Sequence, residues 1–103
     1  MTATLRAEVG PVDDEGILLL DGQEVVALGL DESTTIDRDL ENGDHEIRFT
    51  VKNSGSFGWK ARLRLLVNDQ EVAKVNRSGV FGVDPVYDRT WQIGIVRGEL
   101  DTF

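Results

Sequence analysis

Apolar and polar residues alternate along much of the chain, and strict alternation is typical of β-strands that bury one face. Residues 2–9 show the pattern first, because Ala3, Leu5, Ala7 and Val9 share one side and polar residues occupy the other. The same alternation recurs over residues 46–53, 59–67 and 90–97. These four segments are therefore predicted to be strands with one buried face.

Two short polar pairs predict β-hairpins. Asp21-Gly22 separates two apolar runs, and a type I′ turn favours this dipeptide because both central residues need a positive φ. Asn68-Asp69 is typical of a second turn. The strands that these turns join are predicted over residues 17–20, 23–28, 59–67 and 71–76.

Residues 31–42 carry a mixed pattern. Ile36 and Leu40 are four positions apart, as on one face of a helix, but the β-branched run Thr34-Thr35-Ile36 favours a strand. We predict a strand followed by a loop. With seven or eight strands and no firm helix, the chain is predicted to be all-β, a single antiparallel β-sandwich of jelly-roll or Ig-like type over residues 1–103.

One segment of the chain is repeated. Residues 18–28 align with residues 65–75, at an offset of 47, with five of eleven positions identical. An alternating strand follows each copy, so the repeated unit is a hairpin, a loop and a strand. The repeat indicates either an internal duplication or convergence on one hairpin sequence, and both lead to a sandwich.

Some turn and strand residues resemble known β-domains. Asp21-Gly22-Gln23-Glu24-Val25, followed by Leu40 to Ile47, looks like the rhythm of PEGA-type bacterial β-domains. Gly43 to Phe49, with Ser54-Gly55 and Val67-Asn68-Asp69, is similar to the Fas-apoptosis-inhibitory-molecule β-sandwich. Each resemblance covers about a third of the chain and implies a β-sandwich without catalytic activity.

The charges are unevenly distributed. The net charge is −8, but residues 1–46 hold 13 acids and two bases, whereas residues 47–103 hold nine bases and six acids. The overall negative charge argues against nucleic-acid binding, which needs a basic surface. The separation indicates either acidic strands that neutralise basic ones or a surface that attracts a charged partner.

The composition excludes several functions. The chain has no Cys and one His, so disulfides, thiolate metal sites and most His-based catalysis are excluded, and we expect no cofactor and no metal. No apolar run is long enough to span a bilayer, and residues 1–8 lack the apolar core of a signal peptide. A cytoplasmic protein without membrane contact is therefore expected.

Five basic residues on two strands are the first candidate binding surface: Arg48, Lys52, Lys60, Arg62 and Arg64. If residues 46–67 form one hairpin, Lys52 lies opposite Lys60, Thr50 opposite Arg62 and Arg48 opposite Arg64. Like charges directly opposite each other are destabilising. Either an acidic neighbouring strand, or a bound anion, an acidic partner or a second copy, would then compensate them.

Two loop regions offer weaker candidates. Phe57 and Trp59 lie beside glycines, where aromatic rings could stack on a sugar or anchor a partner, although their parity also fits the core. Acids at Asp37, Asp39 and Glu41 have the spacing of a calcium loop, but Arg48 stands where such a loop needs Glu. The acidic run over residues 13–15 has no defined ligand spacing.

Catalytic motifs are weak throughout. His45 shares parity with Ile47 and Phe49, which is typical of a structural histidine, and no serine lies in a Gly-x-Ser-x-Gly motif. The sequence therefore favours a non-catalytic module for protein–protein interaction or self-assembly, including a homodimer through an exposed edge strand. A carbohydrate- or calcium-binding module is the alternative, and a small enzyme comes third.

Overall fold

The computed structural model describes residues 2–12, 15–29, 31–52, 58–79 and 87–101. Within them the chain forms nine strands and no helix. The strands are β1 (Thr2–Val9), β2 (Glu15–Leu20), β3 (Gln23–Leu28), β4 (Thr34–Glu41), β5 (Gly43–Lys52), β6 (Trp59–Val67), β7 (Gln70–Gly79), β8 (Tyr87–Val96) and β9 (Glu99–Asp101).

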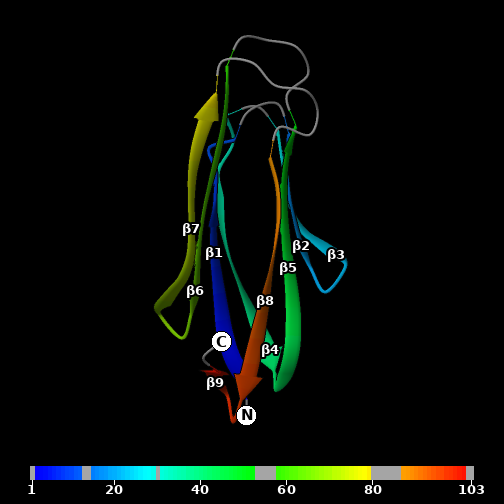
Figure 1. The fold of residues 1–103 in the computed structure, drawn as a ribbon, viewed down its shortest axis with the longest axis vertical. Coiled ribbons are helices and arrows are strands. Elements are labelled where there is room, and N and C mark those ends of the chain that lie inside the picture. The colour runs from blue at the N-terminus through cyan, green and yellow to red at the C-terminus, as the bar shows by residue number, and fades with distance from the viewer. Residues whose placement is uncertain (1, 13–14, 30, 53–57, 80–86, 102–103) are drawn as a thin grey trace.

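The strands form two antiparallel sheets that pack as a sandwich (Figure 1). Sheet A has the strand order β4-β1-β6-β7, and sheet B has the order β3-β2-β5-β8-β9. The predicted all-β sandwich is confirmed. Nine strands replace the predicted seven or eight because β9, with three residues, is too short to show alternation in the sequence.

The core lies between the sheets and is built from the alternating residues. On β1 the side chains of Ala3, Leu5, Ala7 and Val9 are buried, as predicted, while their polar neighbours are largely exposed. Sheet B contributes a matching set of buried side chains: Leu18, Val26, Ile47, Phe49, Val51, Ile93 and Ile95. Alternation thus fixes the inner face of each strand.

Three two-residue turns connect strand pairs, and all six turn residues have positive φ: Asp21 (51°), Gly22 (81°), Asn68 (48°), Asp69 (66°), Arg97 (55°) and Gly98 (72°). Positive φ at both positions is the type I′ geometry, whose twist matches that of the strands. The first two turns confirm the predicted hairpins. The third creates the β8–β9 hairpin, which the sequence analysis missed.

The predicted hairpin between residues 46–53 and 59–67 is wrong. Strand β5 pairs with β2 and β8 in sheet B, whereas β6 pairs with β1 and β7 in sheet A. The chain therefore passes from one sheet to the other between these strands. Alternation identifies the buried face of a strand but not its sheet, because a strand with one apolar face can bury that face in either sheet of a sandwich.

Strand β4 corrects a second prediction. Residues 34–41 are extended throughout and each pairs with a residue of β1, so the loop predicted after the first part of this segment is absent. Ile36 and Leu40 face the same side because a spacing of four is even, and it suits a strand as well as a helix.

The repeated sequence corresponds to equivalent hairpins. In β2–β3 the register shifts between Leu18 and Leu19, so that Val25 has no partner residue on β2. In β6–β7 the register shifts between Leu65 and Leu66, so that Val72 has no partner residue on β6. Both bulges lie at the same position of the repeat. The strands that follow differ, since β2 pairs with β5 but β6 pairs with β1. Structural equivalence is therefore limited to the hairpins.

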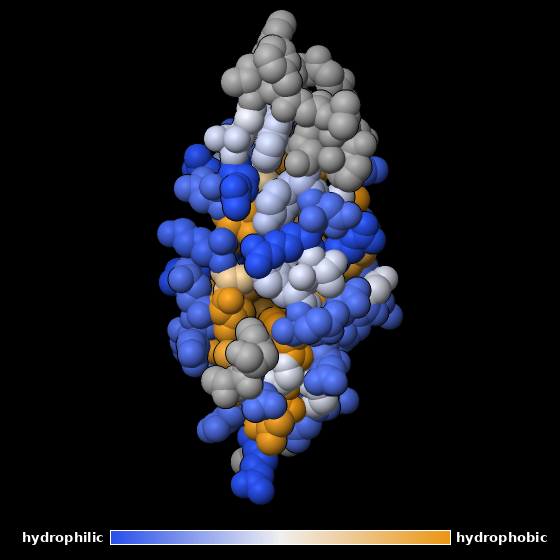
Figure 2. Space-filling view, viewed as in Figure 1, coloured by the Kyte–Doolittle hydropathy of each residue, from blue (hydrophilic) through white to orange (hydrophobic). Residues whose placement is uncertain are grey.

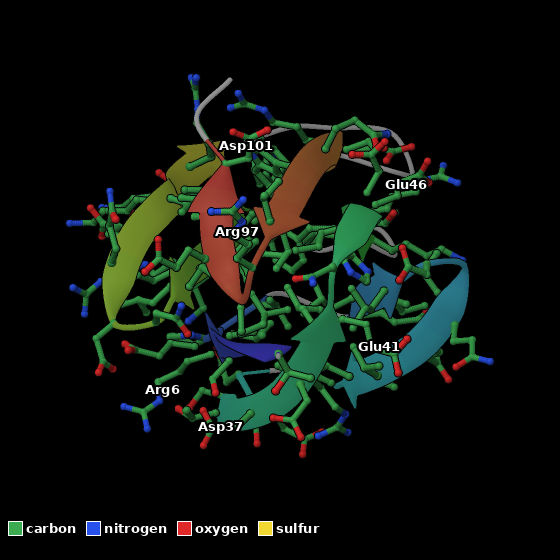
Figure 3. The ribbon with its side chains drawn as sticks, turned by 90° about the horizontal axis from the view of Figure 1, so that it is seen from below. Arg6, Asp37, Glu41, Glu46, Arg97 and Asp101 are labelled. Carbon is green, nitrogen blue, oxygen red and sulfur yellow. The ribbon has the colours of Figure 1, made fainter. Side chains whose placement is uncertain are left out.

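Asparagine side chains connect the turns at one end of the sandwich. Asn68 accepts from the backbone N–H of Thr4 (2.9 Å) and donates through Nδ2 to the carbonyl of Gly98 (2.9 Å). The N–H of Gly98 donates to Oδ1 of Asn42 (2.9 Å). Figure 3 views this end, with Arg97 near its centre. Three turns from two sheets are thereby held together.

Candidate functional site

The five predicted basic residues do not form one surface. Arg48 and Lys52 belong to β5 in sheet B, whereas Lys60, Arg62 and Arg64 belong to β6 in sheet A. The predicted opposition of like charges is therefore absent, and this part of the prediction is wrong. The error follows from the assumption that residues 46–67 form one hairpin, because alternation does not determine which strands become neighbours.

Arg48 is paired with an acid on the neighbouring strand. Its Nε lies 2.9 Å from Oδ1 of Asp88 and its Nη2 lies 2.6 Å from Oδ2, a bidentate contact. The hydrogen bond from Arg48 lowers the pKa of Asp88, and the same bond raises the pKa of Arg48. The charge of Arg48 is thus compensated within sheet B.

Two of the three basic residues on β6 also contact acids. Lys60 Nζ lies 2.5 Å from Asp31 Oδ1, and Arg64 contacts Glu71 (2.8 Å) and Glu8 (3.6 Å). A cavity of 240 Å³ on the outer face of sheet A mixes acidic and basic residues: Glu8, Arg62, Arg64 and Lys74 among them. Neighbouring acids therefore account for the charge of Arg48, Lys60 and Arg64.

Trp59 packs against the core. Its side chain is half-buried, and its ring covers Gly79 so closely that a Cβ there would overlap the indole. The alternative that Trp59 closes the core is thus the one that its packing supports. Phe57 lies outside the described residues.

The predicted calcium-loop spacing lies on a strand. Asp37, Asp39 and Glu41 are part of β4, and Asp37 accepts from Nε of Arg6 (3.0 Å), a pair visible at the rim in Figure 3. Over the described ranges, no group of three His, Asp or Glu residues could hold a metal ion. Of the second acidic segment, residues 13 and 14 lie outside the described part of the chain.

His45 connects three segments of the chain. Its Nδ1 lies 2.7 Å from Oδ2 of Asp21 in the β2–β3 turn, and its Nε2 lies 2.7 Å from the backbone carbonyl of Glu41. A carboxylate and a carbonyl only accept, so both contacts are satisfied together only by the imidazolium. Burial lowers the pKa of His45, but these two hydrogen bonds outweigh it and leave the pKa raised.

An apolar cleft opens between β7 and β8, where one side of the sandwich is not closed. It has a volume of 230 Å³, and we call it the seam cleft. Figure 2 shows hydrophobic side chains gathered between charged flanks on the face that contains this seam. The lining residues are Leu65, Val72 and Ala73 from sheet A and Thr90, Trp91, Gln92 and Ile93 from sheet B.

Beside the seam cleft, one side of β8 is partly unpaired. Strand β9 pairs only with residues 94–96 of β8, so in the described part of the chain residues 87–93 have no neighbouring strand on that side. We call residues 87–93 the free edge of β8. Four consecutive residues of this edge, Thr90 to Ile93, line the cleft.

Aromatic residues cover the inner side of the free edge. The Arg89 guanidinium lies over the ring of Trp91, 5.1 Å from its centroid. The ring of Tyr87 lies 6.0 Å from that of Phe49, which is fully buried. Arg89 lies opposite the buried Phe49, on the inner side of sheet B, and it remains exposed while its guanidinium contacts the indole.

The outer strands of sheet A carry charges that deter pairing. Arg38 on β4 lies opposite the buried Leu5, and Arg77 on β7 lies opposite the buried Ala61. Because opposite residues point to the same face, both exposed arginines are attached on the inner side of an edge strand. Inward-facing charges protect edge strands from added strands. Arg38 also donates to the carbonyl of Asp37 on its own strand (2.9 Å). Strand β8 carries an equivalent arginine, Arg89, but its guanidinium lies over the ring of Trp91.

Comparison of the chain with protein-family models, with curated proteins and with solved structures gave no match. Among the described residues, no helix is long and apolar enough to cross a membrane. The geometry of the chain itself is therefore the basis for a functional proposal.

Proposed function

We propose that this chain is a non-catalytic protein-binding module that takes an extended protein segment along the free edge of β8. The observation that carries the proposal is the seam cleft, where apolar side chains of both sheets lie directly beside the free edge of β8. Strand addition at an exposed sheet edge uses this combination, with affinity from the backbone and specificity from alternate side chains.

The backbone of the free edge has a defined orientation. In a two-residue hairpin, the residues that flank the turn exchange their backbone hydrogen bonds, so Val96 directs its N–H and C=O toward β9. Antiparallel strands alternate in this respect, so Asp88, Thr90 and Gln92 direct theirs to the same side. An added strand would pair with these three residues.

The side chains of an added segment would alternate between the cleft and solvent. Those on the inner side would meet Trp91 and Ile93 of β8 and, across the seam, Val72 and Ala73 of sheet A. Tryptophan is enriched among residues that dominate protein interfaces, because a large half-buried ring contributes much apolar contact. Inner positions of the bound segment are therefore expected to be apolar.

The test uses ¹⁵N-labelled protein and three synthetic peptides in which threonine alternates with valine, leucine or tyrosine. We expect at least one peptide to shift the amide signals of Thr90 and Gln92 and the indole signal of Trp91. The variant Thr90→Pro removes an N–H from the free edge but leaves the pairing with β5, so it should keep the fold and lose binding. Thr90→Ala, which retains the N–H, should bind.

Circular dichroism and the melting temperature check that Thr90→Pro is folded. The proposal is overturned if none of the three peptides shifts these signals in the unmodified protein at a concentration at which sedimentation velocity shows it to be monomeric. It is equally overturned if a folded Thr90→Pro variant binds as well as Thr90→Ala does.

A further inference from the structure

We infer that the segment bound at the free edge of β8 is the same edge of a second copy of this chain. The inference rests on the proposed function and names its partner. Two β8 strands would run antiparallel about a two-fold axis at Thr90, so that sheet B of one copy continues into sheet B of the other.

The length of the free edge fits this arrangement. Among the residues that the structure describes, the free edge has seven residues, 87–93, and Thr90 is the central one. A two-fold axis there pairs each residue of the edge with one residue of the same edge on the partner, and residues 94–96, which follow the edge, pair with β9. The pairs are Tyr87 with the partner's Ile93, Asp88 with the partner's Gln92, Arg89 with the partner's Trp91, and Thr90 with the partner's Thr90.

The chemistry of these pairs is complementary. Arg89 would lie beside the partner's Trp91, which repeats a contact that Arg89 and Trp91 already make within one chain at 5.1 Å. Tyr87 would pack on the partner's Ile93 on the inner side, over the seam cleft. Asp88 can accept a hydrogen bond from the partner's Gln92, and threonine pairs are favourable across strands.

Neighbouring registers are less favourable. A two-fold axis at Arg89 would place two arginines directly opposite each other, which is destabilising. An axis at Trp91 would place Asp88 opposite the partner's Gly94, which β9 already pairs through Asp101. Axes between residues would put inner side chains opposite outer ones. The register at Thr90 therefore uses the edge best.

This dimer has a closed symmetry. Because both copies use the same edge, pairing consumes it, and no further copy adds to β8. The arginines Arg38 and Arg77 guard the outer strands of sheet A. Each copy carries a net charge of −8, so repulsion opposes the dimer at low salt and is screened as salt is added. Association is expected to strengthen with ionic strength.

Single cysteines test the register, since the chain has none of its own. Residues that exchange backbone hydrogen bonds across antiparallel strands have Cα atoms about 5.5 Å apart, within the range that a disulfide bridges. Thr90→Cys is therefore expected to form a disulfide dimer under mild oxidation. Asp88→Cys and Gln92→Cys, equally on the outer side, should each stay monomeric, but a mixture of the two should give the mixed dimer.

Sedimentation velocity of the unmodified protein over a range of concentrations provides the second readout, and we expect a monomer–dimer equilibrium that shifts toward dimer in high salt. The inference is overturned if Gln92→Cys alone cross-links as readily as Thr90→Cys. It is also overturned if the unmodified protein stays monomeric while the synthetic peptides still bind, in which case only the proposed function survives. If the peptides fail to bind as well, both proposals fall.

Discussion

The contact between His45 and Asp21 makes stability depend on pH in a way that one substitution can reverse. In Asp21→Asn the side chain keeps its shape, and Oδ1 can still accept from the backbone N–H of Glu46 (2.8 Å in the present chain). The substitution removes only the carboxylate that faces Nδ1 of His45. Asparagine also tolerates the positive φ of this turn position.

The direction of the pH dependence follows from both groups. The pKa of His45 is raised above 6.5, so its contribution to stability is complete below pH 6.5 and is lost as the pH rises through the folded-state value. Burial raises the pKa of Asp21, but hydrogen bonds from His45 and Glu46 outweigh it and leave the pKa below 3.8. That contribution is complete above pH 3.8 and is lost in more acidic solution. The contact is therefore strongest between pH 3.8 and 6.5.

The size of the effect follows from the exposure of the pair. A hydrogen bond to a charged group contributes about 1.5–3 kcal/mol to stability. The Asp21 side chain is 47% exposed, so solvent screening reduces this to about 1 kcal/mol. At about pH 5.5, Asp21→Asn should therefore lower the melting temperature by about 4–8 °C.

At about pH 9, where imidazole is neutral, the outcome differs. The introduced asparagine can donate through Nδ2 to a neutral Nδ1 of His45, while Nε2–H of His45 donates to the carbonyl of Glu41, so every group is satisfied. We expect little or no loss of stability there. Melting followed by circular dichroism at both pH values measures the difference. An equal loss at both pH values would refute the reasoning, because the contact would then not depend on the charge of His45.

Two further predictions concern the core. Phe49→Ala removes a fully buried ring and should cost about 3–5 kcal/mol in the free energy of unfolding, measured with urea; a loss below about 1 kcal/mol would mean that the sheets close over the cavity. Gly79→Ala places a Cβ against the Trp59 ring and should cost about 1–3 kcal/mol, with Ser78→Ala as the near-neutral control. Equal stability of these two variants would show that the indole moves aside freely.

Local chemistry made part of the fold predictable. Asp21-Gly22 and Asn68-Asp69 determine their turns through a few neighbouring residues, and alternation determines which side chains of β1 and β5 are buried. The same information does not determine which strands become neighbours. The interpretation of Arg48 opposite Arg64 failed for this reason, since the two strands have suitable faces but belong to different sheets.

The candidate binding surface was harder to predict than the fold. The seam cleft joins Val72 of β7 with Trp91 of β8, residues whose proximity depends on how the sheets stack. The sequence pattern indicates that Trp91 lies on the inner, core-facing side of its strand. Alternation does not show that this strand lacks a neighbour on one side. The short β9 decides that, and three residues carry too little pattern to reveal it.

The position of β1 has a consequence for the order in which the protein can fold. This strand lies inside sheet A, between β4 and β6, although it comes first in the chain. Its two neighbours end at Glu41 and Val67, so during synthesis β1 has no partner until β4 has emerged, and its other side stays unpaired until more than half of the sequence has emerged. Sheets built from such distant pairings fold slowly, in about milliseconds to seconds for small β-domains. A nascent chain that stops before β6 is thus expected to expose β1 to aggregation.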